Sequence, residues 1–295
     1  MEYLTGVYSV MGQMENKKIV ITGGNSGIGK ETAIALARMG GEVILAGHDS
    51  RKTAAAVDEI QSISGNHAVY NMEVDLSSLD SVRRMGNHFL EQHDTLDVLI
   101  NNAGVFPTRQ KLTSDGFEFQ IGVNHLAHFL LTGLLMPALI KSPHARIITV
   151  TSKMHKNGEI AFDCFKGYKN YNAQRAYAQS KLANILFSNK LSQLLAAIPR
   201  SHMTSNAVHP GGVRTSITRD MPWILRKVID LFFVSASEGA RPSVMLASDP
   251  ELESVTGKYF DKMQAADACP LAYDPVLQDQ LWIVSEDLTG FQYNL

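Results

Sequence analysis

Short apolar runs alternate with longer segments of helical periodicity along most of the chain. The short runs predict strands over residues 17–22, 42–46, 67–74, 96–100, 145–151 and 202–209. The segments between them carry apolar residues three and four apart and predict helices over 27–39, 50–63, 79–92, 115–140 and 175–197. Strands that alternate with helices are typical of right-handed βαβ units, in which helices cover both faces of a parallel sheet. The pattern therefore predicts an α/β fold with a doubly wound parallel sheet.

Nothing in the sequence divides the chain into separate units. There is no linker rich in Pro, Gly or Ser, no low-complexity segment and no internal repeat. A length of 295 residues suits one α/β domain with a wide sheet. We therefore expect one domain over residues 1–295, with an N-terminal extension (1–15) and a C-terminal tail (270–295).

Composition narrows the functional classes. Hydrophobic residues make up 45% of the chain, which is ample for a core. The net charge of -2 gives no electrostatic support for nucleic-acid binding. Cys164 and Cys269 are the only cysteines, so there is no disulfide framework, and no Cys/His set has the spacing of a zinc site. We expect a reducing compartment: a cytoplasmic protein, or one peripheral on a cytosolic membrane face, and not a secreted one.

Two stretches resemble targeting or membrane segments only superficially. Residues 1–14 carry one acid and no base, and they lack the basic start and long apolar core of a signal peptide. The longest stretch without formal charge, residues 121–140, contains Asn124, Pro137 and two histidines and lies between other alternating elements. These features favour a buried helix over a membrane span. Weak peripheral attachment to a membrane stays open.

A glycine-rich turn, Thr22-Gly23-Gly24-Asn25-Ser26-Gly27-Ile28-Gly29, follows the first strand and opens the first helix. Glycines there allow a tight turn and close approach of the backbone to a pyrophosphate, and the helix N-terminus supplies N–H groups and a favourable dipole. The spacing differs from GxGxxG, since three residues separate the first and second motif glycines. Its position at the first strand–helix junction favours dinucleotide binding over a purely structural turn.

The end of the second strand indicates which dinucleotide is bound. NAD enzymes usually have a carboxylate there that binds the ribose 2′-hydroxyl. This strand ends in Gly47 and His48, with Arg51 and Lys52 in the next turn, and such an uncharged end with nearby basic groups suits a 2′-phosphate. Asp49 argues for NAD, but it lies two places late and suits the N-cap of the next helix. We therefore expect NADP(H), with NAD(H) as the alternative.

Asp75 stands at the end of the third predicted strand. Two interpretations are open. Its carboxylate caps the helix that follows, or it accepts a hydrogen bond from the adenine amino group of a dinucleotide. The sequence favours neither.

Tyr177 and Lys181 stand four residues apart near the start of the helix predicted over 175–197, so their side chains share one helix face. A phenol with its ordinary pKa of about 10 is a poor proton donor or acceptor at neutral pH. A nearby ammonium favours the phenolate and lowers that pKa. We therefore expect Lys181 to make Tyr177 an effective general acid and base.

Four motifs occur in a fixed order: the glycine turn, Asn101-Asn102-Ala103-Gly104 after the fourth strand, Ser152 after the fifth, and Tyr177 with Lys181. This set closely resembles the short-chain dehydrogenase/reductase family, and the resemblance covers nearly the whole chain. That family includes a retinol dehydrogenase branch with the oxidoreductase part of WW-domain-containing oxidoreductase. The chain looks like this branch in residues 123–129, in Ser152 with His155, in 180–184 and in 209–211. No WW domain is visible in the sequence.

The resemblance implies a single Rossmann domain with a sheet of about seven strands and a catalytic tetrad of Asn124, Ser152, Tyr177 and Lys181. It implies dinucleotide contacts at Gly23, Ser26, Ile28, Gly29, Asp75, Leu76, Asn102, Ala103, Gly104, Pro210, Gly211, Val213 and Thr215, and also at Tyr177 and Lys181. His48 and Arg51 would lie near the 2′-phosphate. Many relatives have Arg at the position of His48, and a neutral imidazole holds a phosphate less firmly.

The same resemblance implies a role for each member of the tetrad. Tyr177 would deliver the proton to the substrate oxygen or remove it, and Ser152 would hydrogen-bond that oxygen. Lys181 would lower the pKa of Tyr177, together with the positive ring of the cofactor, and would bridge the ribose hydroxyls. Asn124 would bind water that links Lys181 to solvent.

The histidines near these motifs have structural interpretations. His155 follows Ser152 by three residues and suits a loop residue satisfied by a local hydrogen bond. His209 suits the end of a strand, and His125 and His128 lie at helical spacing and suit a core or an interface. We therefore predict no metal site.

The resemblance implies that residues 216–236 form a lid over the substrate pocket. The apolar runs 221–225 and 228–233 in this segment favour a lipophilic alcohol or carbonyl, such as a retinoid, a steroid or a fatty aldehyde. Ordinary core packing explains the same pattern equally well, and a membrane surface would also suit it.

Two functional classes follow. We expect an NADP-preferring oxidoreductase that acts on a lipophilic small molecule. The alternative is a catalytically idle dinucleotide-binding protein of the same fold that signals or serves as a scaffold, and the presence of both Tyr177 and Lys181 favours the enzyme. The resemblance also suggests a homodimer or homotetramer formed by the helix that carries Tyr177 and the long helix before it.

Overall fold

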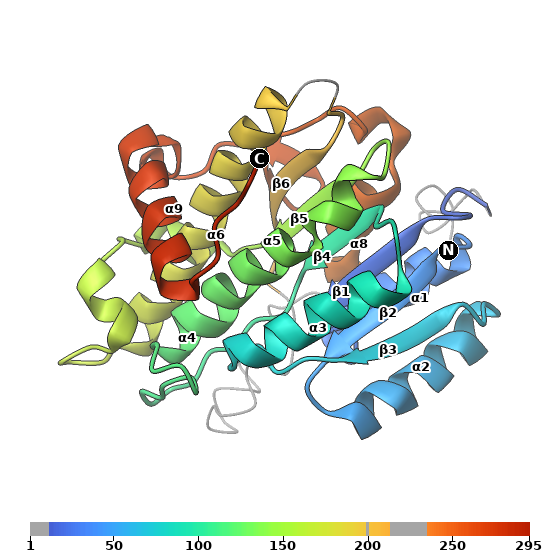
Figure 1. Ribbon diagram of the computed structural model, residues 1–295, viewed down its shortest axis with the longest axis horizontal. Coiled ribbons are helices and arrows are strands. Elements are labelled where there is room, and N and C mark those ends of the chain that lie inside the picture. The colour runs from blue at the N-terminus through green and yellow to red at the C-terminus, as the bar shows by residue number, and fades with distance from the viewer. Residues whose placement is uncertain (1–11, 199–200, 213–234) are drawn as a thin grey trace.

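The computed structural model describes residues 12–198, 201–212 and 235–295, and its centre is one sheet of eight strands (Figure 1). The strand order is β3-β2-β1-β4-β5-β6-β7-β8, and every neighbouring pair is parallel except β7 and β8. The strands are β1 (Lys18–Thr22), β2 (Glu42–Gly47), β3 (Val69–Glu73), β4 (Val98–Asn101), β5 (Arg146–Val150), β6 (Thr204–His209), β7 (Tyr259–Asp261) and β8 (Gln264–Ala266). The predicted doubly wound parallel sheet is confirmed. The short antiparallel β8 is the strand beyond the seven expected.

Helices cover both faces of this sheet, as the alternating pattern predicts (Figure 1). They are α1 (Gly27–Arg38), α2 (Ser50–Ser64), α3 (Leu79–Gln92), α4 (Phe119–Ile121), α5 (Ala127–Ile140), α6 (Ala173–Ala197), α8 (Ala236–Ser248) and α9 (Pro275–Thr289). Successive strand residues point to opposite faces. In β1, Val20 therefore packs on the side of α3 and α5, whereas Ile19 and Ile21 pack on the side of α1, α2 and α8.

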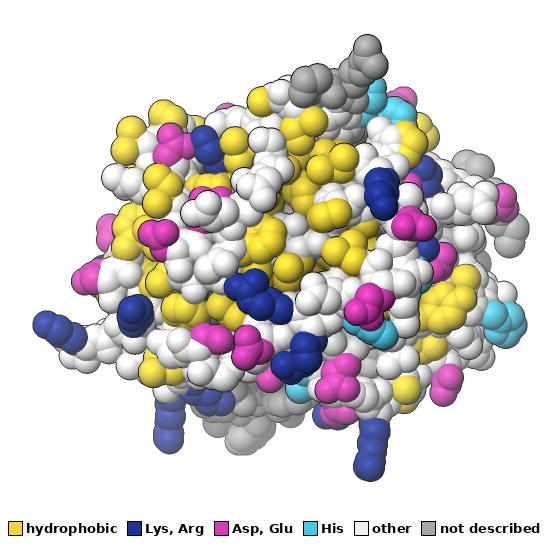
Figure 2. Space-filling view, in the orientation of Figure 1, with side chains coloured by type: hydrophobic (Ala, Val, Ile, Leu, Met, Phe, Trp, Pro, Cys, Tyr) yellow, Lys and Arg dark blue, Asp and Glu magenta, His cyan; other side chains and the backbone are white. Residues whose placement is uncertain are grey.

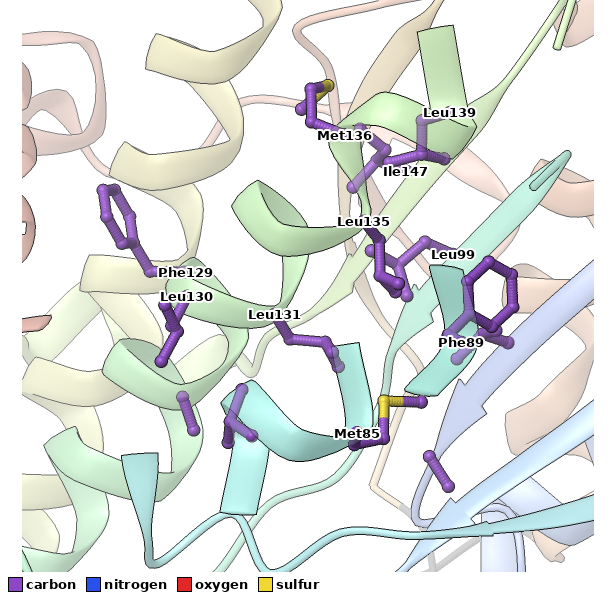
Figure 3. Packing of buried hydrophobic residues seen from close by; sticks show 14 of the residues in the cluster. Met85, Phe89, Leu99, Phe129, Leu130, Leu131, Leu135, Met136, Leu139 and Ile147 are labelled. Atoms are coloured by element: carbon purple, nitrogen blue, oxygen red, sulfur yellow. The ribbon is translucent and has the colours of Figure 1, made fainter. Parts of the chain in front are cut away.

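The larger apolar cluster holds α3 and α5 against the sheet (Figure 3). Leu99 of β4 and Ile147 of β5 belong to it, together with Phe89 of α3 and Leu131 and Leu135 of α5. Each of these five side chains is fully buried. Because burial of one such side chain stabilises a fold by roughly 1.5–3 kcal/mol, this layer fixes α5 and the turn before it.

The long helix predicted over 115–140 contains an irregular turn. Between α4 and α5 the chain forms a π-helical turn, Gly122–Leu126, in which the Ala127 N–H bonds to the Gly122 carbonyl. Such turns are rare and often occur at functional sites. Within the described parts of the chain, Phe119–Ile140 is the one helix long and apolar enough to cross a membrane, and 83% of its most apolar stretch is buried. This burial agrees with the predicted interior helix.

The segment 270–295, predicted as a C-terminal tail, packs against the core. It contains α9, and beyond that helix the Tyr293 hydroxyl donates a hydrogen bond of 2.6 Å to the Phe129 carbonyl of α5. The Phe291 ring lies over Gly133, where a Cβ would stand 2.2 Å from it. The C-terminal segment therefore covers part of α5 within a single chain.

Charged side chains of both signs are interspersed on the molecular face drawn in Figure 2. Several form surface pairs, such as Lys30 with Glu59 at 2.8 Å and Lys153 with Asp261 at 2.9 Å. This mixture agrees with the small net charge and shows no continuous basic stripe on that face.

Candidate active site at the carboxyl ends of the strands

A cavity of about 730 Å³ lies at the carboxyl ends of β1, β2, β4, β5 and β6. Chain order reverses between β1 and β4, and open α/β sheets bind ligands at such a switch point. Most of the predicted contact residues line this cavity: Gly23, Ser26, Ile28, Gly29, His48, Asp75, Leu76, Asn102, Ala103, Gly104, Ser152, Tyr177, Lys181, Pro210 and Gly211.

Some predicted residues do not line the cavity. Arg51 lies on the exposed first turn of α2, and Asn124 is buried behind the cavity wall. Val213, Thr215 and most of the predicted lid, 216–236, lie outside the described residues.

The glycine turn forms a tight backbone cradle at the N-terminus of α1. Gly23 and Gly27 have φ angles of 65° and 54°, which side-chain-bearing residues rarely adopt. A Cβ at Gly29 would stand 2.4 Å from the Gly23 carbonyl oxygen, so only glycine fits there. Ser26 is the N-cap of α1, yet its side chain makes no capping hydrogen bond. These residues fit a dinucleotide, because the backbone is bare where a pyrophosphate would approach the helix N-terminus.

At the end of β2, Gly47 and His48 line the cavity, whereas Asp49, the carboxylate that follows them, does not. Asp49 caps α2 by accepting a hydrogen bond of 3.1 Å from the Lys52 N–H, as predicted, and it pairs with the Lys52 ammonium at 2.8 Å. These contacts with Lys52 lower the pKa of Asp49. A Cβ at Gly47 would stand 2.8 Å from the Thr53 hydroxyl, so the strand end is closely packed as well as uncharged.

The structure decides against one of the two interpretations of Asp75. Ser78, not Asp75, is the N-cap of α3, where its hydroxyl accepts from the Ser81 N–H. Asp75 accepts hydrogen bonds from the N–H and the hydroxyl of Ser77 and lines the cavity beside Leu76. The helix-cap interpretation is therefore wrong, and the adenine contact stays a prediction.

Tyr177, Lys181 and Ser152 meet at the opposite wall of the cavity. Tyr177 and Lys181 lie on the first turns of α6, and their side chains are almost completely buried. The Lys181 ammonium donates a hydrogen bond of 3.1 Å to the Val150 carbonyl and stands 5.5 Å from the centre of the Tyr177 ring. Ser152 follows β5 and caps the short 3-10 turn after it, where its hydroxyl accepts from the Met154 N–H.

Burial changes the proton affinities of this pair in opposite directions. It raises the pKa of Tyr177 to about 12, with a smaller opposing effect of the hydrogen bond with Ser152. It lowers the pKa of Lys181 to about 8, because an ammonium also loses hydration when buried. The expectation of a lowered tyrosine pKa is therefore wrong for the protein groups alone, because desolvation of the phenolate is the largest effect on it.

Asn124 lies in the π-helical turn, and its side chain is bound within the protein. Its Oδ1 accepts a hydrogen bond of 2.8 Å from the Val105 N–H. Its Nδ2 donates to the Val105 carbonyl at 3.1 Å and to the Ser180 hydroxyl at 2.9 Å. Both amide hydrogens are thus used to hold the loop after β4 against α6, and the role of Asn124 in binding water stays a prediction.

Several cavity residues carry no sequence motif, and the sequence did not identify them. Phe106 contacts Tyr177 edge to face with ring centres 5.0 Å apart. The other such members near this end are Phe119, Met154 and Gln174. The only signals in the sequence were the position of Phe106 two residues after Gly104 and that of Gln174 three residues before Tyr177.

The structural interpretations of the histidines are confirmed. His155 is fully buried, and its Nδ1 donates 2.7 Å to the Ser152 carbonyl while its Nε2 accepts from the Cys269 N–H. His209 ends β6, and His125 and His128 are buried in the π-helical turn and in α5. No group of His, Cys, Asp or Glu in the described residues is arranged to hold a metal ion.

Known proteins resemble this chain in sequence and in fold. The model of the family described as short chain dehydrogenase matches residues 17–222. Retinol dehydrogenase 14 of Homo sapiens is 40% identical over 298 residues, which cover 95% of this chain and 88% of that protein. Retinol dehydrogenase 11 of Mus musculus is 42% identical over 289 residues, which cover 97% of this chain and 90% of that protein.

Two solved structures extend the comparison. An uncharacterized protein from Mycobacterium paratuberculosis superposes with a TM-score of 0.81 at 35% identity, covering 98% of this chain and 99% of that one. A short chain dehydrogenase from Shigella flexneri 2a, complexed with NADP, has a TM-score of 0.69 at 21% identity, covering 86% of this chain and 100% of that one. The second likeness shows a shared fold.

Proposed function

The chain belongs to the short-chain dehydrogenase/reductase family, in its retinol dehydrogenase-like branch, and we propose that it transfers a hydride between NADP(H) and a lipophilic alcohol or carbonyl. The family establishes an oxidoreductase. The choice of NADP, the class of substrate and the proton-transfer residue are our proposals, and each is supported by a separate part of the cavity.

The dinucleotide would be held along one wall of the cavity. Bound NADP(H) supplies or accepts the hydride. Gly23, Ser26, Ile28 and Gly29 would hold its pyrophosphate at the N-terminus of α1, where bare backbone N–H groups and the helix dipole favour an anion. The remaining contacts would come from Asp75 and Leu76 at the adenine, Asn102, Ala103 and Gly104 in the middle, and Pro210, Gly211, Val213 and Thr215 at the nicotinamide end.

The end of β2 supports a preference for NADP. The cavity wall there consists of Gly47 and His48 and carries no carboxylate that could accept from a ribose 2′-hydroxyl. The carboxylate of Asp49 is paired with Lys52 and caps α2. A 2′-phosphate would therefore meet little repulsion and could gain a donor from His48, with Arg51 in the same exposed turn.

Tyr177 would exchange the proton with the substrate oxygen. Because its pKa is raised to about 12, the phenol keeps its proton at neutral pH and is ready to donate it to a carbonyl oxygen. The hydroxyl of Ser152, on the same wall, would hydrogen-bond that oxygen as negative charge develops. Lys181 would steady Tyr177 from behind, since it is anchored to the Val150 carbonyl. The protein groups alone thus keep Tyr177 in the protonated form that carbonyl reduction uses.

Apolar side chains support a lipophilic substrate. The cavity that Tyr177 lines is also lined by Phe106, Phe119, Val123 and Met154. Gln174, in the first turn of α6, adds a polar group. Burial of a hydrocarbon group against such a surface lowers the free energy by roughly 25 cal/mol per Å² of apolar area removed from water. The related proteins are named retinol dehydrogenases, which makes a retinoid alcohol or aldehyde the first candidate and steroids and fatty aldehydes the next.

The convergence of Tyr177, Lys181 and Ser152 with the glycine turn on one cavity is the observation that carries this proposal. We would test it with a panel of lipophilic aldehydes, ketones and alcohols, each with NADPH or NADP and with NADH or NAD, read by nicotinamide absorbance. We expect reduction of at least one lipophilic carbonyl with NADPH. Tight dinucleotide binding in calorimetry without turnover of any compound would overturn it in favour of the idle, scaffold-like alternative.

A further inference from the structure

We propose that His128 is a positioning residue that fixes the loop 102–105 of the dinucleotide site by joining its two anchors, Thr22 and Asn124. The functional meaning of this inference rests on the proposed dinucleotide chemistry, because the loop lines the cavity. The contacts themselves do not depend on it. His128 is the second residue of α5; it is fully buried and does not line the cavity.

The loop is held at both ends by side chains. At its start, the Thr22 hydroxyl accepts hydrogen bonds from the Asn102 N–H at 2.9 Å and from the Ala103 N–H at 3.0 Å. At its end, the Asn124 side chain binds both the N–H and the carbonyl of Val105. Thr22 belongs to β1 and Asn124 to the π-helical turn, so two elements far apart in sequence hold one short loop.

The His128 ring connects these two anchors. Its Nε2 lies 2.9 Å from the Thr22 hydroxyl and its Nδ1 lies 3.0 Å from the Asn124 carbonyl. Loop, Thr22, His128 and Asn124 therefore form a closed ring of hydrogen bonds. The ring borders the catalytic wall, since a Cβ at Gly104 would stand 3.3 Å from the Lys181 ammonium.

The hydrogen bonds in this ring have a single possible direction. A backbone carbonyl only accepts, so Nδ1 of His128 carries the proton that is donated to the Asn124 carbonyl. Burial lowers the pKa of His128 to about 4, so the ring is neutral and its Nε2 accepts. The Thr22 hydroxyl donates to Nε2 because both of its lone pairs already accept from Asn102 and Ala103, and its other acceptor, the Ile100 carbonyl, is farther away at 3.4 Å. An apolar substitute would remove both hydrogen bonds of the ring, so the Thr22 hydroxyl could donate only to the more distant Ile100 carbonyl and the Asn124 carbonyl would lose the His128 donor.

His125 provides a matched control three residues earlier. It is equally buried, and burial lowers its pKa to about 3. Its Nε2, however, pairs with the Ser285 hydroxyl of α9 at 2.9 Å, and within the described residues no hydrogen bond joins its ring to Thr22 or to the loop 102–105. Replacement of either histidine by leucine disturbs the core to a similar extent, but only the change at His128 opens the ring.

The experiment compares His128→Leu with His125→Leu in the full-length protein. We expect His128→Leu to weaken NADPH binding by about tenfold in calorimetry, and to speed amide hydrogen exchange of residues 102–105 by a similar factor. The KM for the carbonyl should change by less than about twofold, because the side-chain hydrogen bonds of His128 go to Thr22 and Asn124 and not to the substrate wall. His125→Leu should lower the melting temperature without these effects. His128→Gln carries a donor and an acceptor, so it should restore part of the binding and serves as the test if the leucine variant does not fold.

The proposal would be overturned if His125→Leu and His128→Leu changed NADPH affinity and amide exchange of residues 102–105 equally. A general effect on core packing would then explain both variants. Exchange and binding are measured without turnover. If the unaltered protein binds NADPH but reduces no carbonyl, the proposed function fails while the role of His128 is still tested.

Discussion

The two walls of the cavity are built in different ways. The wall at β1 and α1 is made of backbone, and its glycines stand where there is no room for a side chain. A Cβ at Gly29, for example, would stand 2.4 Å from the Gly23 carbonyl oxygen. The wall at β5 and α6 is made of buried side chains, and burial changes their chemistry, raising the pKa of Tyr177 and lowering that of Lys181. The first wall therefore depends on shape and the second on proton affinity. A substitution that removes a polar atom but keeps the volume of the side chain should therefore impair the second wall. A substitution that adds atoms should impair the first.

The largest effect is expected from removal of one oxygen atom in the second wall. Tyr177→Phe keeps the ring and its edge contact with Phe106 but removes the titratable hydroxyl. Turnover should fall by roughly a hundredfold or more, because the substrate oxygen loses its proton partner. The melting temperature should stay nearly unchanged, and NADPH affinity should fall far less than turnover, since most of the expected dinucleotide contacts lie outside Tyr177. Near-normal turnover at saturating cofactor would contradict the role given to Tyr177.

The first wall should respond to one added carbon atom. Gly29→Ala places a Cβ against the Gly23 carbonyl and 2.6 Å from the Asn102 side chain, so the cradle must open. We expect NADPH affinity to fall by about tenfold or more in calorimetry. Gly65→Ala is the control, because Gly65 has a φ of 73° at the end of α2 with open space around it. It should lower the melting temperature through backbone strain and leave affinity unchanged; a similar loss of affinity in both variants would contradict a specific cradle.

Cofactor preference should change with one carboxylate at the end of β2. Gly47→Asp is hindered by the Thr53 hydroxyl, 2.8 Å from the new Cβ, so we pair it with Thr53→Ala. The carboxylate repels a 2′-phosphate but accepts from a 2′-hydroxyl, and the double variant should bind NADH more tightly than NADPH. Thr53→Ala alone is the control and should keep the NADPH preference. Equal affinities of the unaltered protein for both cofactors would count against an NADP enzyme.

The pH dependence should differ between the two reaction directions. Carbonyl reduction uses the protonated phenol, which is present up to high pH because the pKa of Tyr177 is raised to about 12. Reduction should therefore stay level near neutrality and decline above about pH 8, where Lys181 loses its proton. Alcohol oxidation needs the phenolate, whose fraction rises by about tenfold per pH unit below the pKa. The measurement is the ratio of oxidation to reduction rates between pH 6 and 9, and a ratio that falls with pH would contradict these proton affinities.

Local patterns were enough to predict the order of elements as far as β6, and thus most of the sheet, but α8, β7 and α9 were not predicted. Runs such as the nearly all-apolar 98–100 of β4 and 147–150 of β5 identify strands buried on both faces, since burial imposes this pattern over a few residues. The strand β8 escaped prediction because its three residues, Gln264–Ala266, are exposed and have no apolar alternation. The π-helical turn Gly122–Leu126 escaped because its sequence is compatible with regular helix, and only the structure shows the contacts of Asn124 and His128 there.

For the candidate site, the motif residues could be recognised but their environment could not. The glycine turn, Ser152, Tyr177 and Lys181 were identified from residue type and order, and the structure brings them to one cavity. The direction of the pKa shift of Tyr177 was predicted wrongly, because an attraction at four-residue spacing was weighed without the burial that opposes it. Phe106 and Met154 were missed, because a wall residue of this kind has no motif and is defined only by its neighbours.

The sequence by itself determined which groups are available: glycines where backbone must approach a ligand, a tyrosine and a lysine on one helix face, and alternating apolar runs that form a parallel sheet. These are properties of residue type and of spacing within one or two turns, which are already present in the primary structure. Tertiary structure decided how deeply the groups are buried and which distant segments meet, as when Thr22, His128 and Asn124 hold one loop. Desolvation and long-range hydrogen bonds depend on atoms supplied by the whole fold, so proton affinities and positioning follow only from the folded chain.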